Sequence, residues 1–534
     1  MIATLDIEAE HWTRFKTACL VTEYGEVSHF SSAAALDDAV RGLGRGAHVY
    51  AHRGGGFDFL FLMPLQSVVL SGGDVLRAQS GETWLHDSYA LLPTSLQKIG
   101  EAVGLQKLPN RSDRMHELSL AEAEEHCQRD CEVLLRGVLS HRDWVVQVPH
   151  PRPGVPRTAG ATALRCLEAY EPEVVQHLAK HPIGALDWRA HGQAVQGNRL
   201  ESFCLGHRSP VYEYDRNGSY NAAWGEGPLP IGPFRRVQRE VPGRYGFYFC
   251  EEIRQSRSTL PVVAPDGVWQ YDGQDQWLTQ EELDLLRLSG GDARVVHGWI
   301  SEHTAHFGWR TVQALYPLKS AGRPWAKAVL SALHGKFCEG LEWETFYHDP
   351  GCGGWACYRA DRELRLPTWH HRPLIAAAIL ARGRLALWRV AQELLDRDRR
   401  IYLLNTDSIH TDCPPQDFPA PLGVGVGQWR LEHGPVEALY LQPGLYGLRT
   451  PEGEPVKSVA VGGAPPGGVP WEVLERAAQG EPITLRWEAG LESFKGNSQA
   501  FRLAVAKHAR SVHLHPGHKR VLAADWLGYQ DQQG

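Results

Sequence analysis

The stretch YLLNTDSIH at residues 402–410 predicts a tight turn between two apolar strands, with Asp407 at the turn. Acidic residues are common at such turns for local reasons, so the position is not specific by itself. A second acid, Asp215, ends the strand-like stretch VYEYD at residues 211–215. Two carboxylates brought together by strand ends could hold Mg²⁺, which prefers oxygen ligands together with phosphate. The pair therefore predicts a metal-dependent site in the second half of the chain.

The stretch KAVLSALHGKF at residues 327–337 lies between these two acids in the sequence. At helical spacing, Lys327, Ser331 and His334 share one face. That face could present a cation and polar groups to a triphosphate, where lysines neutralise the charge that develops on a transferred phosphoryl group. The alternative is an ordinary amphipathic surface helix.

A second set of acids lies near the N-terminus. Asp6 and Glu8 alternate along a predicted strand and so point to one side of it. Asp58 follows a glycine-rich turn in HRGGGFDFLFL, and Asp130 shares one face of a predicted helix with His126. A single DxE is common and usually structural. Together, however, the four acids could hold two divalent cations, the usual arrangement for activating water in phosphodiester cleavage.

The order of apolar runs and breaks predicts several domains. Residues 1–140 alternate strand-like and helical patterns, which is typical of an α/β domain. The Pro- and Gly-rich stretch at 150–160 indicates a linker. Further predicted elements are strands over 210–250, helices over 323–338 and 372–396, a strand, turn and strand over 400–411, and a Gly/Pro break at 462–470.

The amino-acid composition limits which classes of protein the chain can belong to. The chain has 534 residues, 43% of them hydrophobic, with 18 Trp, which predicts a folded protein of two to four domains. No apolar run is long enough to span a membrane. The ten cysteines lack a CxxC pair, which favours a reduced, intracellular protein. The net charge of −7 does not indicate nucleic-acid binding, but a local basic surface matters more than the sum.

In order and spacing, these motifs resemble those of the protein-primed family B DNA polymerases of small phages, tectiviruses and linear plasmids. The resemblance runs from Asp6 to at least Tyr446. It implies template-directed DNA synthesis with a proofreading 3′–5′ exonuclease, two Mg²⁺ (or Mn²⁺) ions per active site, and a monomer. The implied ligands are Asp6, Glu8, Asp58 and Asp130 in the exonuclease, with His126 beside the attacking water, and Asp215 and Asp407 in the polymerase.

The same resemblance implies further contacts with substrates. Tyr220 would exclude a ribose 2′-hydroxyl. The implied contacts to the incoming nucleotide are Tyr220, Lys319, Lys327 and His334. The implied contacts to DNA or to the primer protein are Phe57, Ser88, Lys107, Arg199, Arg384 and Tyr446.

The fold expected from the resemblance is a ribonuclease H-like α/β exonuclease joined to an α+β right-hand polymerase with palm, fingers, thumb and two insertions of the protein-priming type. The expected boundaries are 1–150 exonuclease, 151–205 linker, 206–225 first part of the palm, 226–315 first insertion with palm strands, 316–338 fingers, 339–371 second insertion, 372–438 second part of the palm, and 439–534 thumb.

Several motif positions depart from the family pattern. The usual DTD is Asn405-Thr406-Asp407, so one carboxylate is an amide and metal affinity should fall. Ser331 and His334 stand where the family has Asn and Tyr, and His126 replaces a Tyr. Other replacements are Arg53 for Asn, Val195 for Tyr and Gly444 for Lys.

The expected partners are template and primer DNA, dNTPs and a terminal protein that supplies the first hydroxyl, in the cytoplasm of a bacterial host. One alternative is a family B polymerase that starts chains without a primer. Another is a nuclease or nucleic-acid-binding protein whose polymerase site has decayed, because of Asn405 and Ser331. Zinc binding by Cys338, Cys352, Cys357 and His370 is a further, less favoured hypothesis, since their spacing is not a standard zinc pattern.

Overall fold

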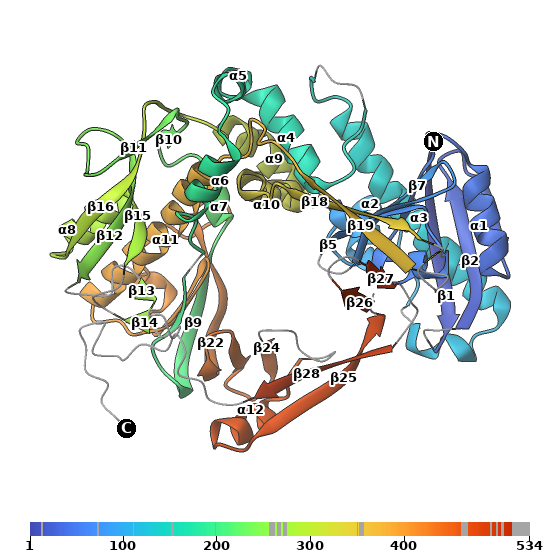
Figure 1. Cartoon of the computed structure of the whole chain (residues 1–534). Helices are drawn as coiled ribbons and strands as arrows, with labels where there is room; N and C mark the ends of the chain where they lie inside the picture. Colours follow the sequence, from blue (N-terminus) through green and yellow to red (C-terminus); the bar gives the residue numbers. More distant parts are fainter. Residues whose placement is uncertain are drawn as a thin grey trace. The chain divides into compact units, whose positions relative to one another are not determined.

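In the computed structural model, the described residues are 1–11, 14–62, 64–71, 74–109, 112–150, 154–197, 199–255, 262–263, 269–270, 275–349, 351, 357–460, 468–491, 494–497, 500–502 and 507–514. The chain divides into two compact units, which are described separately (Figure 1). The first comprises 1–172, 313–366 and 488–510, and the second comprises 173–312, 367–487 and 511–534.

The first unit is built on one eleven-stranded sheet in the order β26-β27-β19-β18-β5-β6-β7-β4-β1-β2-β3. Its N-terminal strands are β1 (Ile2–Glu10), β2 (Arg14–Thr22), β3 (Val27–Phe30), β4 (His48–Ala51), β5 (Ser67–Ser71), β6 (Asp74–Ser80) and β7 (Thr83–Asp87). β1 runs antiparallel to β2 and parallel to β4, which gives the mixed α/β arrangement predicted from the alternating apolar runs.

Helix α3 (Leu120–Val145) packs against β1 and β2. It begins at a capping box, in which Ser119 and Glu122 satisfy each other's backbone N–H groups. Its buried residues recur at helical spacing and include Cys127, Cys131 and Leu134, so one face is fixed on the sheet. The remaining helices of this part are α1 (Ala33–Gly42), α2 (Leu96–Val103) and α4 (Ala159–Tyr170).

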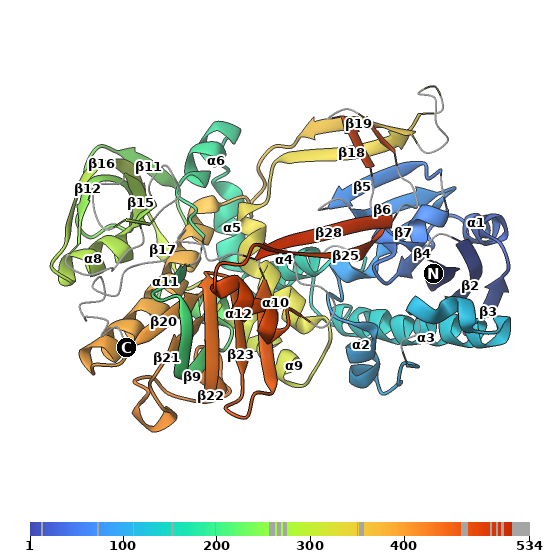
Figure 2. The ribbon, with the colours of Figure 1, turned by 90° about the horizontal axis from the view of Figure 1, so that it is seen from below.

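The hairpin of β18 (Glu342–His348) and β19 (Cys357–Leu364) joins this sheet through β5, as Figure 2 shows. Phe346 and Tyr358 of the hairpin pack into the same apolar core as Leu5 and Val68. The Tyr358 hydroxyl also accepts a hydrogen bond from the Leu65 N–H at 2.8 Å. The sheet therefore extends across residues far apart in the sequence, and its far edge is formed by β26 (Phe494–Asn497) and β27 (Ala500–Arg502).

The predicted 323–338 helix is α10 (Ala326–Gly335), which is followed by a short 3₁₀ turn, Lys336–Cys338. α10 packs against α4, and α9 (Trp309–Ser320) precedes it. The stretch expected to be a linker, 151–205, contains three helices: α4, α5 (Pro172–Lys180) and α6 (Ala185–Gly192). The buried Ala163, Cys166 and Leu167 form an apolar face on α4.

The second unit contains a seven-stranded antiparallel sheet in the order β24-β23-β22-β9-β21-β20-β8. Its strands are β8 (Leu200–Ser202), β9 (Gly206–Arg216), β20 (Ile401–Asn405), β21 (Ser408–Thr411), β22 (Trp429–Gln442), β23 (Leu445–Arg449) and β24 (Pro455–Ala460). β22 runs across the expected palm–thumb boundary at 438: its pairing with β9 extends, with register shifts, from Trp429 to Tyr440, and its pairing with β23 extends from Glu437 to Gln442.

Helix α11 (Pro373–Asp396) covers this sheet and matches the helix predicted at 372–396. Leu387, Trp388 and Leu394 of α11 pack with Ile401 and Ile409 of the hairpin strands.

A separate four-stranded sheet lies within the expected first insertion, and α8 (Gln280–Leu288) packs on it. Its strands, in order across the sheet, are β11 (Phe234–Val237), β16 (Asp292–Ser301), β12 (Gly246–Arg254) and β15 (Gln276–Thr279). Within the described residues, the helix nearest the C-terminus is α12 (Trp471–Ala478), and β25 (Ile483–Leu491) pairs with β28 (Lys507–Leu514).

Candidate active sites

The first candidate site is the group of acids Asp6, Glu8, Asp58 and Asp130 in the first unit. β1 carries Asp6 and Glu8 at alternating positions that are partly exposed, while Leu5 before them and Ile7 between them are buried. The Ile7 N–H donates to Asp58 Oδ1 at 2.8 Å, which fixes Asp58 beside this strand. Strand and turn therefore deliver three of the acids to one place.

A glycine makes the approach of Asp58 possible. Asp58 begins a 3₁₀ turn, Asp58–Phe61, directly after a first 3₁₀ turn, Gly54–Gly56. A Cβ on Gly55 would lie 1.9 Å from the carbonyl oxygen of Val75 on β6. Only glycine lets this turn pack so closely on the sheet, so the HRGGGFD motif is a packing requirement as well as a carrier of the acid.

Helix α3 brings Asp130 to the group. The Cys127 thiol donates to the carbonyl oxygen of Asp6 at 3.1 Å, and Thr4 Oγ1 donates to the carbonyl oxygen of Cys131 at 2.9 Å. These bonds hold the face of α3 that carries His126 and Asp130 against β1. The structure thus brings together all four acids and the histidine that the sequence predicted.

The four acids repel one another. Burial raises the pKa of Asp6 to about 7, with a further contribution from Asp130. Burial and then Asp6 raise the pKa of Glu8 to about 9. Burial also raises the pKa of Asp58 and of Asp130, and Asp6 adds to the rise at Asp58. So many carboxylates in one shielded place are typical of a site that binds cations.

Lys107 supplies a positive charge to this group. Its ammonium donates to Asp130 Oδ2. Its positive charge offsets part of the rise that burial causes in the pKa values of Asp130, Asp6 and Glu8. The sequence predicted Lys107 as a contact to DNA or primer protein, whereas the structure places it within the carboxylate group. Asp130 Oδ1 is buried and has no hydrogen-bond partner among the described residues. An all-oxygen donor set with an unsatisfied carboxylate oxygen fits a divalent cation such as Mg²⁺.

Two other predicted residues lie near this group. Ser88 is fully buried, and its hydroxyl is 3.0 Å from His52 Nδ1, so the structure does not support it as a direct contact to DNA. Phe57 is partly exposed and packs on Phe61 at a centroid distance of 5.3 Å. Sequence reasoning missed His52, which directly precedes Arg53 in the HRGGGFD motif and whose pKa burial lowers to about 4.

The second candidate site is formed by Asp215 and Asp407 in the second unit. In the antiparallel pairing of β9 with β21, Asp215 lies opposite Ser408. The Arg216 N–H donates to the carbonyl oxygen of Asp407 at 2.8 Å. Both acids are partly exposed, and burial raises the pKa of Asp215. The register therefore sets the two predicted acids side by side at one end of the strands.

The turn itself is held in an unusual conformation. Thr406 has φ of 60°, and its N–H donates to the carbonyl oxygen of Arg199 at 2.7 Å. The Asp407 N–H donates to the carbonyl oxygen of Asn405 at 2.6 Å. A non-glycine residue with positive φ persists where its surroundings impose it. Here the neighbouring strand imposes it and fixes the position of Asp407.

Tyr220 lies on α7 (Ser219–Ala223), directly after β9. A Cβ on Gly383 of α11 would lie 3.3 Å from the Tyr220 ring, so the ring packs closely on that helix. Burial, and then the charge of Asp407, raises the pKa of Tyr220 to about 12. The predicted ring is therefore a neighbour of the predicted acid.

The three expected DNA contacts in this unit are buried. Arg199 is 1% exposed, donates to both oxygens of Glu201 and lies 4.6 Å from the centroid of Trp388. Arg384 is 6% exposed and donates to Glu282 and to two backbone carbonyls. Tyr446 is fully buried in the sheet. In the structure, all three side chains are held inside the fold.

A buried ion pair behind Asp215 was not predicted from the sequence. Glu213, two residues before Asp215, is 2% exposed and accepts from Lys457 Nζ at 2.5 Å, while His410 Nε2 lies 3.5 Å away. Burial would raise the pKa of Glu213, but His410 and Lys457 outweigh it and lower the pKa to about 2. The E-x-D pattern in VYEYD signals Glu213, whereas Lys457 comes from β24, 244 positions away.

The remaining predicted residues lie in the first unit. Lys327 and Ser331 are exposed on α10, and burial lowers the pKa of His334 to about 4. Lys319 Nζ lies 4.6 Å from the centroid of Tyr316. Of the four candidate zinc ligands, Cys352 and the side chain of Cys357 are outside the described residues, and Cys338 and His370 belong to different units.

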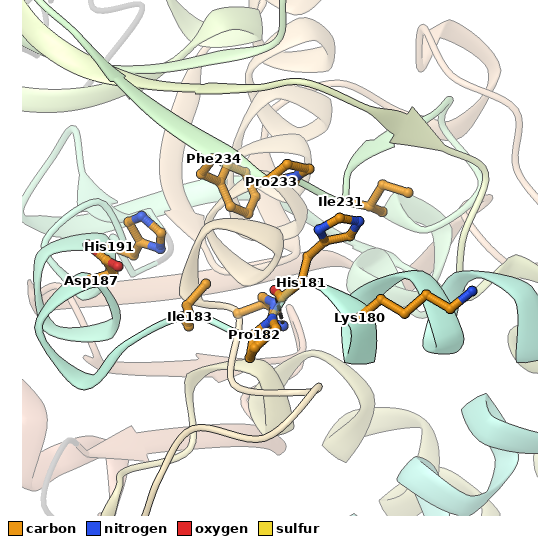
Figure 3. A pocket seen from close by; sticks show the side chains of 11 residues that line it. Lys180, His181, Pro182, Ile183, Asp187, His191, Ile231, Pro233 and Phe234 are labelled. Atoms are coloured by element: carbon orange, nitrogen blue, oxygen red, sulfur yellow. Dashed lines mark hydrogen bonds between the residues drawn. The ribbon is translucent and has the colours of Figure 1, made fainter.

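A pocket of about 340 Å³ lies elsewhere in the second unit, between α6 and the start of β11 (Figure 3). It is lined by Ile183, Asp187, His191, Phe234 and Arg372 among others, and by none of the acids of either candidate site. Arg372 donates to the carbonyl oxygens of Leu178 and His181, so it caps the C-terminal end of α5. Burial lowers the pKa of His191 to about 4.

No family model matches the chain. A DNA-directed DNA polymerase of Enterobacteria phage PRD1 is 31% identical over 256 residues, which is 47% of this chain. The match spans 40% of the length of that relative.

Among the helices of the described ranges, none has the length and apolar character needed to span a bilayer.

Solved structures show the same fold over nearly the whole chain. Phi29 DNA polymerase complexed with primer-template DNA covers 97% of this chain and 100% of its own, with a TM-score of 0.75 and 15% sequence identity. The same polymerase with primer-template DNA and incoming nucleotide substrates gives the same TM-score. Its complex with single-stranded DNA gives 0.71 at 16% identity. The chain therefore has the fold of phi29 DNA polymerase, which confirms the mixed α/β multidomain fold class that the resemblance implied.

Proposed function

We propose that the chain is a protein-primed family B DNA polymerase with its own 3′–5′ exonuclease. The observation that carries the proposal is the register that sets Asp215 beside Asp407, in a fold that aligns with phi29 DNA polymerase over 97% of this chain. The 31% identity to the phage PRD1 polymerase supports it further. The nucleotides and the template strand are the substrates, and a bacterial host's cytoplasm is the proposed location.

In synthesis, a primer hydroxyl attacks the α-phosphate of a dNTP. A new P–O bond forms, the bond to the β-phosphate breaks, pyrophosphate leaves, and the hydroxyl proton passes to solvent. Asp215 and Asp407 would hold the divalent cations, which polarise the phosphate and stabilise the leaving oxygens. Tyr220 packs on α11 beside Asp407 and limits the space at the sugar. Lys319 and Lys327 are proposed contacts to the triphosphate.

In proofreading, the second site hydrolyses the last phosphodiester bond of a mismatched strand. Asp6, Glu8, Asp58 and Asp130 would hold the cations that this reaction needs. Lys107 donates to Asp130 and offsets part of the rise that burial causes in its pKa. His126, one helical turn before Asp130, is placed to orient the attacking water. Phe57, which is partly exposed, is a proposed contact to the single strand.

The proposed source of the first hydroxyl is a separate terminal protein. The test incubates the chain with template, Mg²⁺ and one labelled dNTP, with and without candidate small proteins from the same genome. Label that stays on a protein band after denaturation supports protein priming. Labelled free oligonucleotide in the absence of any protein would instead identify a primer-independent enzyme.

A further inference from the structure

Three histidine rings of the second unit lie together beside helix α5. His177 and His181 are four positions apart, one near the end of α5 and the other directly after it, so they lie on one side of the chain. The centroids of their rings are 4.7 Å apart, and the ring of His303 lies 5.5 Å from that of His177. His303 comes from the turn between β16 and β17 (Thr304–Ala305). The cluster therefore joins two segments that are distant in the sequence.

These separations match those of imidazole rings that share a tetrahedral metal ion. A Zn–N bond is about 2.0–2.1 Å long and the ring centroid lies about 1.1 Å beyond the nitrogen, which puts the centroid about 3.2 Å from the metal. At a tetrahedral angle of about 109°, two such centroids are about 5.2 Å apart. The two measured separations, 4.7 and 5.5 Å, lie on either side of that value.

A backbone carbonyl sets the orientation of the central ring. His177 Nε2 lies 3.1 Å from the carbonyl oxygen of Gly232, so this nitrogen carries the proton and donates. In the neutral ring, His177 Nδ1 is then the unprotonated nitrogen, which is the form that binds a metal. A metal-binding histidine usually donates its other N–H to a carbonyl or carboxylate in this way, which fixes the tautomer.

Hydrogen bonds to main-chain groups hold the segments that carry the cluster. The carbonyl oxygen of His303 accepts from the Ile231 N–H at 3.0 Å, which fixes the turn after β16. Arg372 donates to the carbonyl oxygens of Leu178 and His181, which fixes the end of α5. The backbone around the three rings is therefore set before any ligand binds.

We propose that His177, His181 and His303, here called the three-histidine site, bind one Zn²⁺ ion, with water as the fourth ligand. Neutral imidazole is a preferred ligand of Zn²⁺, whereas Mg²⁺ prefers oxygen ligands such as the carboxylates of the two candidate active sites. The nitrogens of the three rings do not meet at one point as they stand, and the exposed rings of His181 and His303 turn toward His177 when the ion binds. The ion then holds the end of α5 against the turn after β16 and stabilises the second unit. This inference does not depend on the proposed function.

The test measures Zn²⁺ binding to the full chain by competition with a chromophoric chelator. Mg²⁺ is present at the same excess in every sample, so that the difference between wild type and variant reports on the imidazole ligands. His181→Gln and His303→Gln should each lower the affinity for this ion by about 100-fold. With Co²⁺ in place of Zn²⁺, the wild type should show the strong visible absorption of a four-coordinate ion, and both variants should lose it.

The matched control is His306→Gln, which removes an exposed histidine three residues after His303. It should bind Zn²⁺ as tightly as the wild type does. If His303→Gln also binds like the wild type, the ion lies on His177 and His181 alone and the three-histidine site is wrong. Equal Zn²⁺ binding by the wild type and His181→Gln/His303→Gln would overturn the proposal as well.

Thermal unfolding separates loss of the ion from loss of the fold. In EDTA, the wild type and His181→Gln/His303→Gln should unfold at the same midpoint, because both substituted side chains are exposed. With free Zn²⁺ about 100-fold above its Kd, the wild-type midpoint should rise by about 5 °C relative to that of the double variant. An equal rise in both proteins would show that the metal acts elsewhere and would contradict the proposal.

Discussion

Arg216 donates its backbone N–H to the carbonyl oxygen of Asp407 at 2.8 Å, which ties the turn of the β20–β21 hairpin to the strand of Asp215. The position of Asp407 is therefore set by main-chain bonds that do not depend on its own side chain. Substitutions of the carboxylates at this site should change chemistry while leaving the local backbone in place.

Restoring the missing acid at position 405 should improve cation binding. Asn405→Asp places a third carboxylate at the turn, and an added charge on an oxygen ligand favours Mg²⁺. We expect the Mg²⁺ concentration for half-maximal extension to fall by about threefold to tenfold. A titration of extension rate against Mg²⁺ measures this, with the exposed Gln416→Glu, which adds the same charge outside the hairpin, as the control. An unchanged or higher requirement would show that Asn405 does not face the cations.

The exonuclease should depend on Asp58 without affecting synthesis. Asp58→Asn keeps the hydrogen bond to the Ile7 N–H but removes a charge from the acid group. Degradation of a single strand should fall by on the order of 10²–10³-fold, comparable with the loss of one preorganised electrostatic group. Extension of a matched primer should stay within about twofold. Equal loss of both activities would contradict two separate sites.

Loss of Lys107 should move the pH dependence of the exonuclease. Lys107 lowers the pKa of Asp130, Asp6 and Glu8, so its removal raises them further. These acids act when ionised, above their pKa, and the acidic limb of the rate profile should therefore shift to higher pH in Lys107→Met. Lys98→Met, on the exposed side of α2, is the control. A lower rate with an unshifted profile would indicate a DNA contact, as the sequence suggested.

Lys457→Met should destabilise the second unit by about 2 kcal/mol. It leaves Glu213 buried without its cation, and the expected cost is below the roughly 3–5 kcal/mol of a fully buried pair because Lys457 is one-third exposed. The pKa of Glu213 is lowered from 4.5 to about 2, so this stabilisation is present above pH 4.5 and lost toward pH 2.

The difference in unfolding midpoint between wild type and Lys457→Met should accordingly shrink as pH falls through that window. The exposed Lys180→Met should show no such difference. Adding Glu213→Gln should recover part of the loss, because no buried charge then remains. A constant difference across this pH range would argue against the ion pair.

The acids could be grouped from the sequence because each is tied to a local pattern. Alternation on a strand placed Asp6 with Glu8, helical spacing placed His126 with Asp130, and a hairpin placed Asp407. Contacts that depend on strand register or on strands distant in the sequence could not be predicted. Examples are the ion pair of Lys457 with Glu213 and the packing of Arg77 on Trp343. The burial of Arg199 and Arg384, two of the predicted DNA contacts, could not be foreseen either, because it depends on their ion pairs with Glu201 and Glu282.

The most direct test of the central claim is extension of a primed template by Asp407→Asn in an Asp6→Asn background, in which the nuclease cannot obscure the result. The account predicts that Asp6→Asn alone extends the primer at close to the wild-type rate. It predicts that adding Asp407→Asn reduces extension by on the order of 10³-fold or more. Extension by the double variant at the rate of Asp6→Asn would contradict the claim that Asp215 and Asp407 form the polymerase site.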